Sequence, residues 1–261
     1  MAALNNLCWG DSRPAQALKQ RAVDGGALEL AQAALCVETS SGDLAENCCW
    51  LLSSLVDGDD DVAAPRKQRA VAAGSIEAIV AALVAHCTDV RVQQYGCKAL
   101  QRLCDGDDAG VEERAERAAT AGALEAVAAA MEAHREALGE FGCTALCSIC
   151  YGASEAADAR CARAAAAGAI ELLVGRIQGG GVGDRDVAQA CAALANLCAG
   201  QDAGGDDRRQ KAAELGAIEA VAASGEAEGM GEMALLSICG RSADFRARAE
   251  AAGVNASVFH S

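Results

Sequence analysis

Cysteine is the residue type with the most obvious chemical potential in this chain of 261 residues, which contains 14 of them. Nine cysteines recur in two columns of a repeated segment. The first column is Cys49, Cys97, Cys143 and Cys191, and the second is Cys8, Cys104, Cys150, Cys198 and Cys239. Where both columns occur together they lie two turns apart on one helix face, which is too far for a disulfide. Because a free cysteine behaves as a small apolar residue, we expect both columns in the core.

Two of these cysteines, together with Cys147, could instead hold an iron–sulfur cluster. Cys143, Cys147 and Cys150 match the spacing of the iron–sulfur ligands in radical S-adenosylmethionine enzymes. Those ligands lie in a loop, whereas this segment is predicted to be helical and two of the three belong to the core columns, so we expect no cluster. Cys147 remains a candidate accessible thiol. It keeps a redox-responsive regulatory subunit open as an alternative function.

An acidic segment partly matches a calcium-binding EF-hand loop. Asp105, Asp107 and Glu116 fall at the first, third and twelfth positions, with Gly110 at the sixth. Ala109 stands at the fifth position, where an oxygen ligand is needed. We interpret the segment as a solvated loop, and a calcium-responsive regulatory subunit remains an alternative.

Histidines and short catalytic motifs give little sign of an enzyme. His86 and His134 are one repeat period apart and close the same predicted helix of successive repeats, where the helix dipole favours such a group. None of the common nucleophile, phosphate-loop, dinucleotide-binding or zinc-protease motifs occurs in the sequence. We expect no catalysis, no metal and no cofactor. An accessory subunit of an enzyme is a second alternative.

The elements that position these residues come from a repeated motif of glycine, a small residue, an aliphatic residue and glutamate. It begins at Gly26, Gly74, Gly122, Gly168 and Gly216, at a nearly constant interval that falls within the periods typical of repeat arrays. Apolar residues then recur at steps of three and four, which indicates helices rather than strands. Each glycine suits the left-handed turn that ends a helix, and each glutamate falls in the first turn of the next helix, where the dipole favours its charge. We predict three helices per repeat: a first of about two turns, a second such as 76–85 and a third such as 90–103.

The third helices share a further pattern of cysteine, two variable or small residues and leucine. Copies of it are Cys97-Lys98-Ala99-Leu100, Cys143-Thr144-Ala145-Leu146 and Cys191-Ala192-Ala193-Leu194. Together with the glycine corner, this pattern resembles the armadillo-repeat family. Residues 130–134 and 141–146 resemble a subtype common in algal and other protist proteins and in the armadillo segment of large leucine-rich-repeat kinases. The Asn and Trp columns of nuclear-import receptors are mostly missing, which argues against a cargo receptor of that kind.

The resemblance implies an all-α fold, a right-handed α-α superhelix of about four full repeats plus partial terminal repeats. It would form a single solenoid over 1–261, with units near 1–12 (partial), 13–60, 61–108, 109–154, 155–200, 201–242 and 243–261 (partial). Because the first residues already belong to a third helix, we expect a fragment of a longer protein or an incomplete gene model, and end-to-end association is the alternative. The implied function is a non-catalytic intracellular scaffold or adaptor that binds an extended peptide or a partner helix in a concave groove.

Third helices line that groove in the family, so we look there for partner-binding residues. The candidates are Trp50, Ser54, Tyr95, Lys98, Arg102, Phe141, Ser148 and Asn196. Aromatic and arginine side chains are frequent hot spots of interfaces. The Lys98–Arg102 pair could select an acidic protein or peptide partner.

Charge and hydropathy exclude other classes of partner. The 22 basic and 37 acidic residues give a net charge of −15, which provides no basic surface for nucleic acid. No apolar run reaches the roughly 18 residues of a membrane span, and no signal peptide is present, so we expect a cytoplasmic protein that could also enter the nucleus. Basic clusters at Arg66-Lys67-Arg69 and Arg208-Arg209-Lys211 follow acidic loops, and we expect these charges to alternate along the outer edge.

Overall fold

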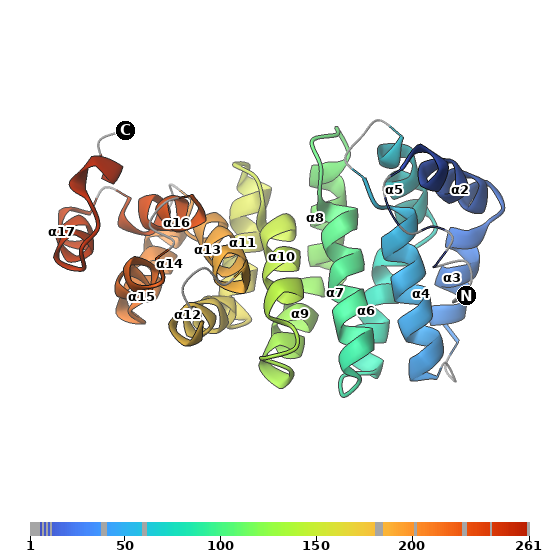
Figure 1. Cartoon of the computed structure of the whole chain (residues 1–261), viewed down its shortest axis with the longest axis horizontal. Coiled ribbons are helices and arrows are strands. Elements are labelled where there is room, and N and C mark those ends of the chain that lie inside the picture. The colour runs from blue at the N-terminus through green and yellow to red at the C-terminus, as the bar shows by residue number, and fades with distance from the viewer. Residues whose placement is uncertain are drawn as a thin grey trace. The chain divides into compact units, whose positions relative to one another are not determined.

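The computed structural model describes residues 12–37, 41–58, 62–180, 185–200, 203–225, 229–240 and 242–259, together with residues 6, 8 and 10. Throughout these ranges the regular elements are helices and none is a strand, so the predicted all-α class is confirmed. The chain divides into two compact units, Met1–Ile149 and Cys150–Ser261, and each is described by itself (Figure 1).

Three-helix repeats build the first unit. Its first helices are α2 (Arg13–Asp24), α5 (Ala63–Ala72) and α8 (Val111–Thr120). Its second helices are α3 (Ala27–Leu35), α6 (Ser75–Ala85) and α9 (Ala123–Ala133), and its third helices are α4 (Gly42–Leu55), α7 (Val90–Cys104) and α10 (Gly139–Cys150). Helices of the same kind pack on one another, with α4 beside α7 and α3 beside α6 (Figure 1).

The second unit repeats this arrangement. Its helices are α11 (Glu155–Ala166), α12 (Ala169–Gly179), α13 (Arg185–Leu197), α14 (Ala203–Glu214), α15 (Ala217–Ala223), α16 (Met230–Cys239), α17 (Ala243–Ala251) and the 3₁₀ turn η1 (Ala256–Phe259). The third helices α13 and α16 pack on each other, as do the second helices α12 and α15.

Glycine corners join the first and second helices, as predicted. Gly74 has a φ of +85° and Gly122 a φ of +92°, in the left-handed region that favours glycine. The Gly74 N–H donates to the Val71 carbonyl at 2.9 Å, and the Gly74 carbonyl accepts from the Ala78 N–H at 3.2 Å. One residue therefore ends α5 and begins α6, which meet at a bend of 67°. Among the described helices none alone is long and apolar enough to cross a membrane, and this bent pair is the one combination that passes by length and composition.

The first helices are longer than predicted. They contain 10 to 12 residues, about three turns instead of two. In α5, for example, the helix already begins at Ala63 and includes the basic residues Arg66 and Lys67.

Several of these basic residues are also buried, so the expectation of charges alternating along a solvated outer edge is wrong for them. Arg66, Arg114 and Arg208 are 1%, 0% and 4% exposed. Arg66 Nε donates to the Leu55 carbonyl at 2.7 Å, and Arg208 Nε donates to the Leu197 carbonyl at 2.5 Å. These carbonyls lie at the ends of third helices, which lack intrahelical donors and carry partial negative charge. Each arginine therefore caps the preceding third helix.

The two cysteine columns lie in the core, as predicted. All nine of their members are buried. Burial raises the pKa of the Cys97 thiol to about 12, which keeps it protonated and inert at neutral pH. The remaining thiol of the iron–sulfur spacing, Cys147, is half-buried.

Candidate interaction surface

An aromatic pair marks the place where α4 and α7 pack together. Trp50 on α4 and Tyr95 on α7 are both half-buried. Their ring centroids are 5.5 Å apart and their planes differ by 16°, so the rings are stacked. Within the described residues, the indole N–H of Trp50 is buried and has no acceptor. The structure thus brings two of the sequence-predicted residues into direct contact.

A charged pair adjoins this stack. The Arg91 guanidinium lies 5.6 Å from the centroid of the Tyr95 ring, within the range of a cation–π contact. Arg91 Nη2 is 3.0 Å from Glu46 Oε1. The Glu46 carboxylate raises the pKa of Arg91 above its ordinary value, because it stabilises the cation.

The Arg102 side chain is already engaged by two groups of the first unit. Its Nη1 donates to the Ser53 carbonyl at 3.0 Å and lies 3.0 Å from Asp57 Oδ1. Asp57 Oδ2 lies 3.3 Å from Nζ of Lys19, a fully buried lysine. One carboxylate is therefore shared by two cations. Asp57 is therefore part of a network that bridges neighbouring repeats.

The remaining predicted residues differ in exposure. Lys98 is half-buried, and its pKa is lowered by that burial and by the nearby positive charge of Arg102. Ser54 is only 3% exposed and offers little surface to a partner. Phe141 and Ser148 are half-buried on α10. Asn196 is half-buried on α13, which belongs to the second unit.

Sequence reasoning missed the charged residues Glu46, Arg91, Asp57 and Lys19 around this surface. A signal for one of them exists, because Lys19 and Lys67 are separated by one repeat period. Lys67 Nζ donates to the Asp105 carbonyl at 2.8 Å, just after the end of α7. The two lysines therefore play similar parts at successive repeats.

The segment that resembles an EF-hand loop is organised around a guanidinium. Arg114 Nη1 and Nη2 donate to the two carboxylate oxygens of Asp108 at 2.7 and 2.6 Å. This bidentate pairing, together with the Gly110 N–H, lowers the pKa of Asp108 to about 2 against the effect of partial burial. Glu116 lies within α8. Over the described part of the chain, no group of three or more His, Cys, Asp or Glu side chains is placed to hold a metal ion.

The two histidines occupy the predicted position. His86 and His134 are the C-cap residues of α6 and α9. His134 Nε2 lies 2.7 Å from the Cys87 carbonyl, so the tautomer that carries a proton on Nε2 donates there.

Three-helix repeats, left-handed glycine corners and stacked third helices define an armadillo-type helical solenoid, so the predicted fold is confirmed. A designed armadillo repeat protein in complex with the peptide (KR)4 matches with a TM-score of 0.67 at 19% identity, over 99% of this chain and 90% of that chain. Computationally designed armadillo repeat proteins for modular peptide recognition match with a TM-score of 0.69 at 21% identity, over 90% of both chains.

Another solved structure is also similar. It comes from work on a phosphorylation switch that controls the interaction between cadherin and beta-catenin, and it matches with a TM-score of 0.68 at 13% identity, over 97% of this chain and 50% of that chain. No protein-family model matches the sequence, and no curated protein matches it. At these identities the likeness to solved structures shows the fold alone.

Proposed function

We propose that this protein is a non-catalytic scaffold or adaptor that binds an extended peptide or a partner helix along the third helices α4 and α7. The Trp50–Tyr95 stack is the observation that carries the proposal. Two half-buried rings held in register by neighbouring helices offer a large contact area at small entropic cost, because their positions are already fixed. The designed armadillo repeat protein in complex with the peptide (KR)4 supports this mode of action, since it pairs a similar fold with a bound peptide.

The finer parts of the proposal concern the charge of the partner, the continuity of the solenoid and the location of the protein in the cell. We propose an acidic residue of the partner near Lys98, whose half-buried side chain follows Tyr95 by one turn of α7. Arg102 contributes less than its charge suggests, because Asp57 already neutralises it. We further propose that the repeats form one continuous solenoid in the cytoplasm or nucleus, of the subtype that the 130–134 and 141–146 segments resemble.

The test is selection of binding peptides from a random display library on the purified whole chain, followed by affinity measurements on variants. We expect Trp50→Ala and Tyr95→Ala each to weaken the selected peptides about tenfold or more, as for hot-spot aromatic residues. Tyr151→Ala is the matched control, because Tyr151 is 60% exposed and belongs to the second unit. If binding is the same in the Tyr95→Ala and Tyr151→Ala proteins, with helicity intact in both, the stack is not the binding surface.

A further inference from the structure

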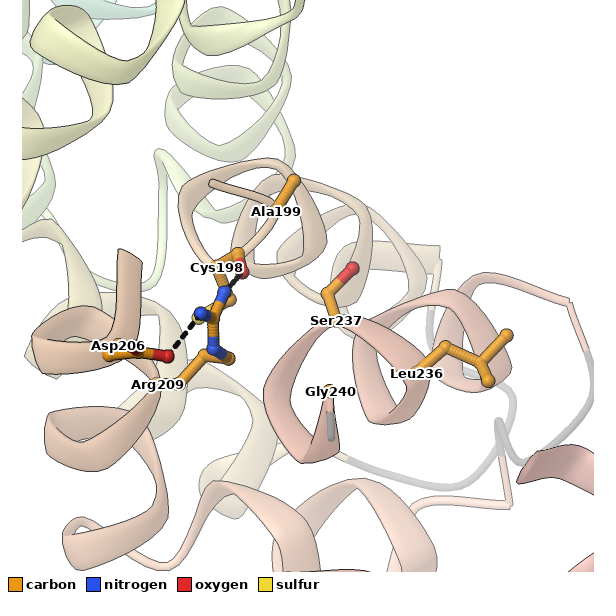
Figure 2. Close-up of a pocket in the computed structure, with 7 residues that line it drawn as sticks. All are labelled: Cys198, Ala199, Asp206, Arg209, Leu236, Ser237 and Gly240. Carbon is orange, nitrogen blue, oxygen red and sulfur yellow. Dashed lines mark hydrogen bonds and ion pairs between the residues drawn. The ribbon is translucent and has the colours of Figure 1, made fainter. Parts of the chain in front are cut away.

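A cavity lies between the last turns of α13 and α16 in the second unit, and the proposed function does not use it. Its volume is about 610 Å³, which is in the range of ligand pockets. Figure 2 shows Arg209 and Asp206 on one side, with Ser237 and Gly240 of the α16 end on the other.

The accessible charge of the cavity is a carboxylate. Arg209 Nη1 donates to the Cys198 carbonyl at 2.8 Å, and its Nη2 lies 2.5 Å from Asp206 Oδ1 (Figure 2). Arg209 Nη1 also donates to the Gly200 carbonyl. The Arg209 side chain is 13% exposed, so its charge is enclosed and engaged. Asp206 is 75% exposed and can receive a second cation on its outer side.

In the first unit, side chains of the protein itself fill the position that corresponds to this cavity. Arg102 and Ser237 both stand two residues before a cysteine of the second column, and Asp57 and Ala199 both stand two residues after the end of a third helix. In the first unit the Arg102 guanidinium occupies this position, 3.0 Å from both Asp57 and the Ser53 carbonyl. In the second unit the two replacements are small, and both line the cavity.

We propose that this cavity binds the guanidinium group of an arginine side chain from a partner. The arginine takes the place that Arg102 fills in the first unit. Its cation pairs with the exposed carboxylate of Asp206, and its remaining N–H groups face the Ser237 hydroxyl. Arginine is favoured over lysine because its planar fork can serve several acceptors at once.

The first test is a titration of the whole ¹⁵N-labelled chain with N-acetyl-arginine amide, followed by NMR. The uncharged N-acetyl-citrulline amide, of nearly the same shape, is the control ligand. We expect saturable shifts at Ser237 and Asp206 with the arginine probe and at least fivefold weaker binding of citrulline. We expect Asp206→Asn to weaken the arginine probe at least fivefold and the equal charge change Asp207→Asn, outside the cavity lining, to leave it unchanged.

A second variant fills the cavity in the manner of the first unit. Ser237→Arg combined with Ala199→Asp recreates the Arg102–Asp57 pair, and we expect this protein to fold with unchanged helicity and to lose the probe. Equal binding of arginine and citrulline, full affinity in Asp206→Asn, or binding by the folded double variant would each overturn the proposal. Trp50→Ala should leave this titration unchanged, so a failure here is separable from a failure of the first-unit scaffold.

Discussion

At the scale of single residues, one arginine per repeat donates hydrogen bonds to the end of a third helix, where the carbonyls face protein instead of water. Arg66, Arg114 and Arg208 each donate Nε–H to a carbonyl eleven residues earlier in the chain. Arginine suits this role because its guanidinium can serve the helix end and a second acceptor together and stays charged when buried. Removing it would leave buried carbonyls without donors, which is costly.

The Asp108–Arg114 ion pair makes the stability of the folded protein depend on pH. Its pKa is about 2 in the folded protein against 3.8 without partners, chiefly because Arg114 donates to it. A folded pKa below the unfolded one stabilises the protein above the unfolded pKa, and the stabilisation is lost as the pH falls from about 5 towards 2. We expect the free energy of unfolding to drop between pH 6 and pH 3 by about 1 kcal/mol more in the wild type than in Asp108→Asn.

Urea unfolding of both proteins at the two pH values measures this difference. Asp107→Asn is the control, since Asp107 is an exposed carboxylate of the same loop. Identical pH dependence of wild type and Asp108→Asn would show that the Asp108–Arg114 pair contributes nothing to stability.

The sequence predicts some residue roles better than others. The cysteine columns were predictable, because a small apolar residue at a fixed place in each repeat has one simple explanation, the core. The arginine column was missed although Arg66, Arg114, Arg160 and Arg208 recur at the same interval as the glycine corners. A charged residue is assigned to solvent by default, and its burial depends on a helix end that only the packed structure supplies.

At the scale of elements, the glycine corner fixes how a first helix passes to a second. Gly74 adopts a φ of +85°, which an L-residue with a side chain reaches only at a cost of about 1–2 kcal/mol. Gly175 lies exposed within α12, and an added Cβ there would meet no atom within 4 Å. The backbone conformation therefore requires glycine at position 74, whereas position 175 can accept a side chain.

The same substitution should have opposite effects at these two sites. We expect Gly74→Ala to destabilise the protein by about 1–2 kcal/mol, and Gly175→Ala to stabilise it by about 0.5–1 kcal/mol because alanine favours the helix. Urea midpoints of the two variants and the wild type give the signs directly. A stability loss at both positions, or at neither, would contradict the assignment of Gly74 as a conformational requirement.

Helix type and order were predictable from the period, whereas helix length was not. The predicted second helix 76–85 and third helix 90–103 lie within one residue of α6 and α7 at each end. The first helices are longer than the predicted two turns, and in α5 the helix already includes Arg66 and Lys67. For the candidate site, the sequence predicts only that Trp50 and Tyr95 both belong to groove-lining third helices, and the Asp57 network depends on packing between repeats.

At the scale of the whole molecule, the repeats within each unit contact their neighbours along the chain. In the first unit α4 packs on α7, and in the second unit α13 packs on α16. Stability in such an array is a sum of local terms, so a local defect spreads to adjacent repeats and fades beyond them. The position of a destabilising change should therefore decide which helices open.

Two substitutions of the same buried leucine position test this. Leu100 on α7 and Leu194 on α13 are both fully buried, so replacing either by alanine should cost about 2–5 kcal/mol. In hydrogen exchange followed by mass spectrometry, we expect Leu100→Ala to accelerate exchange in α4 to α9 and to spare α14 to α17. Leu194→Ala should accelerate exchange in α12 to α16 and spare α2 to α4. Uniform acceleration throughout the chain in both variants would mean that it unfolds as one cooperative body, and the repeat-by-repeat account of its stability would fail.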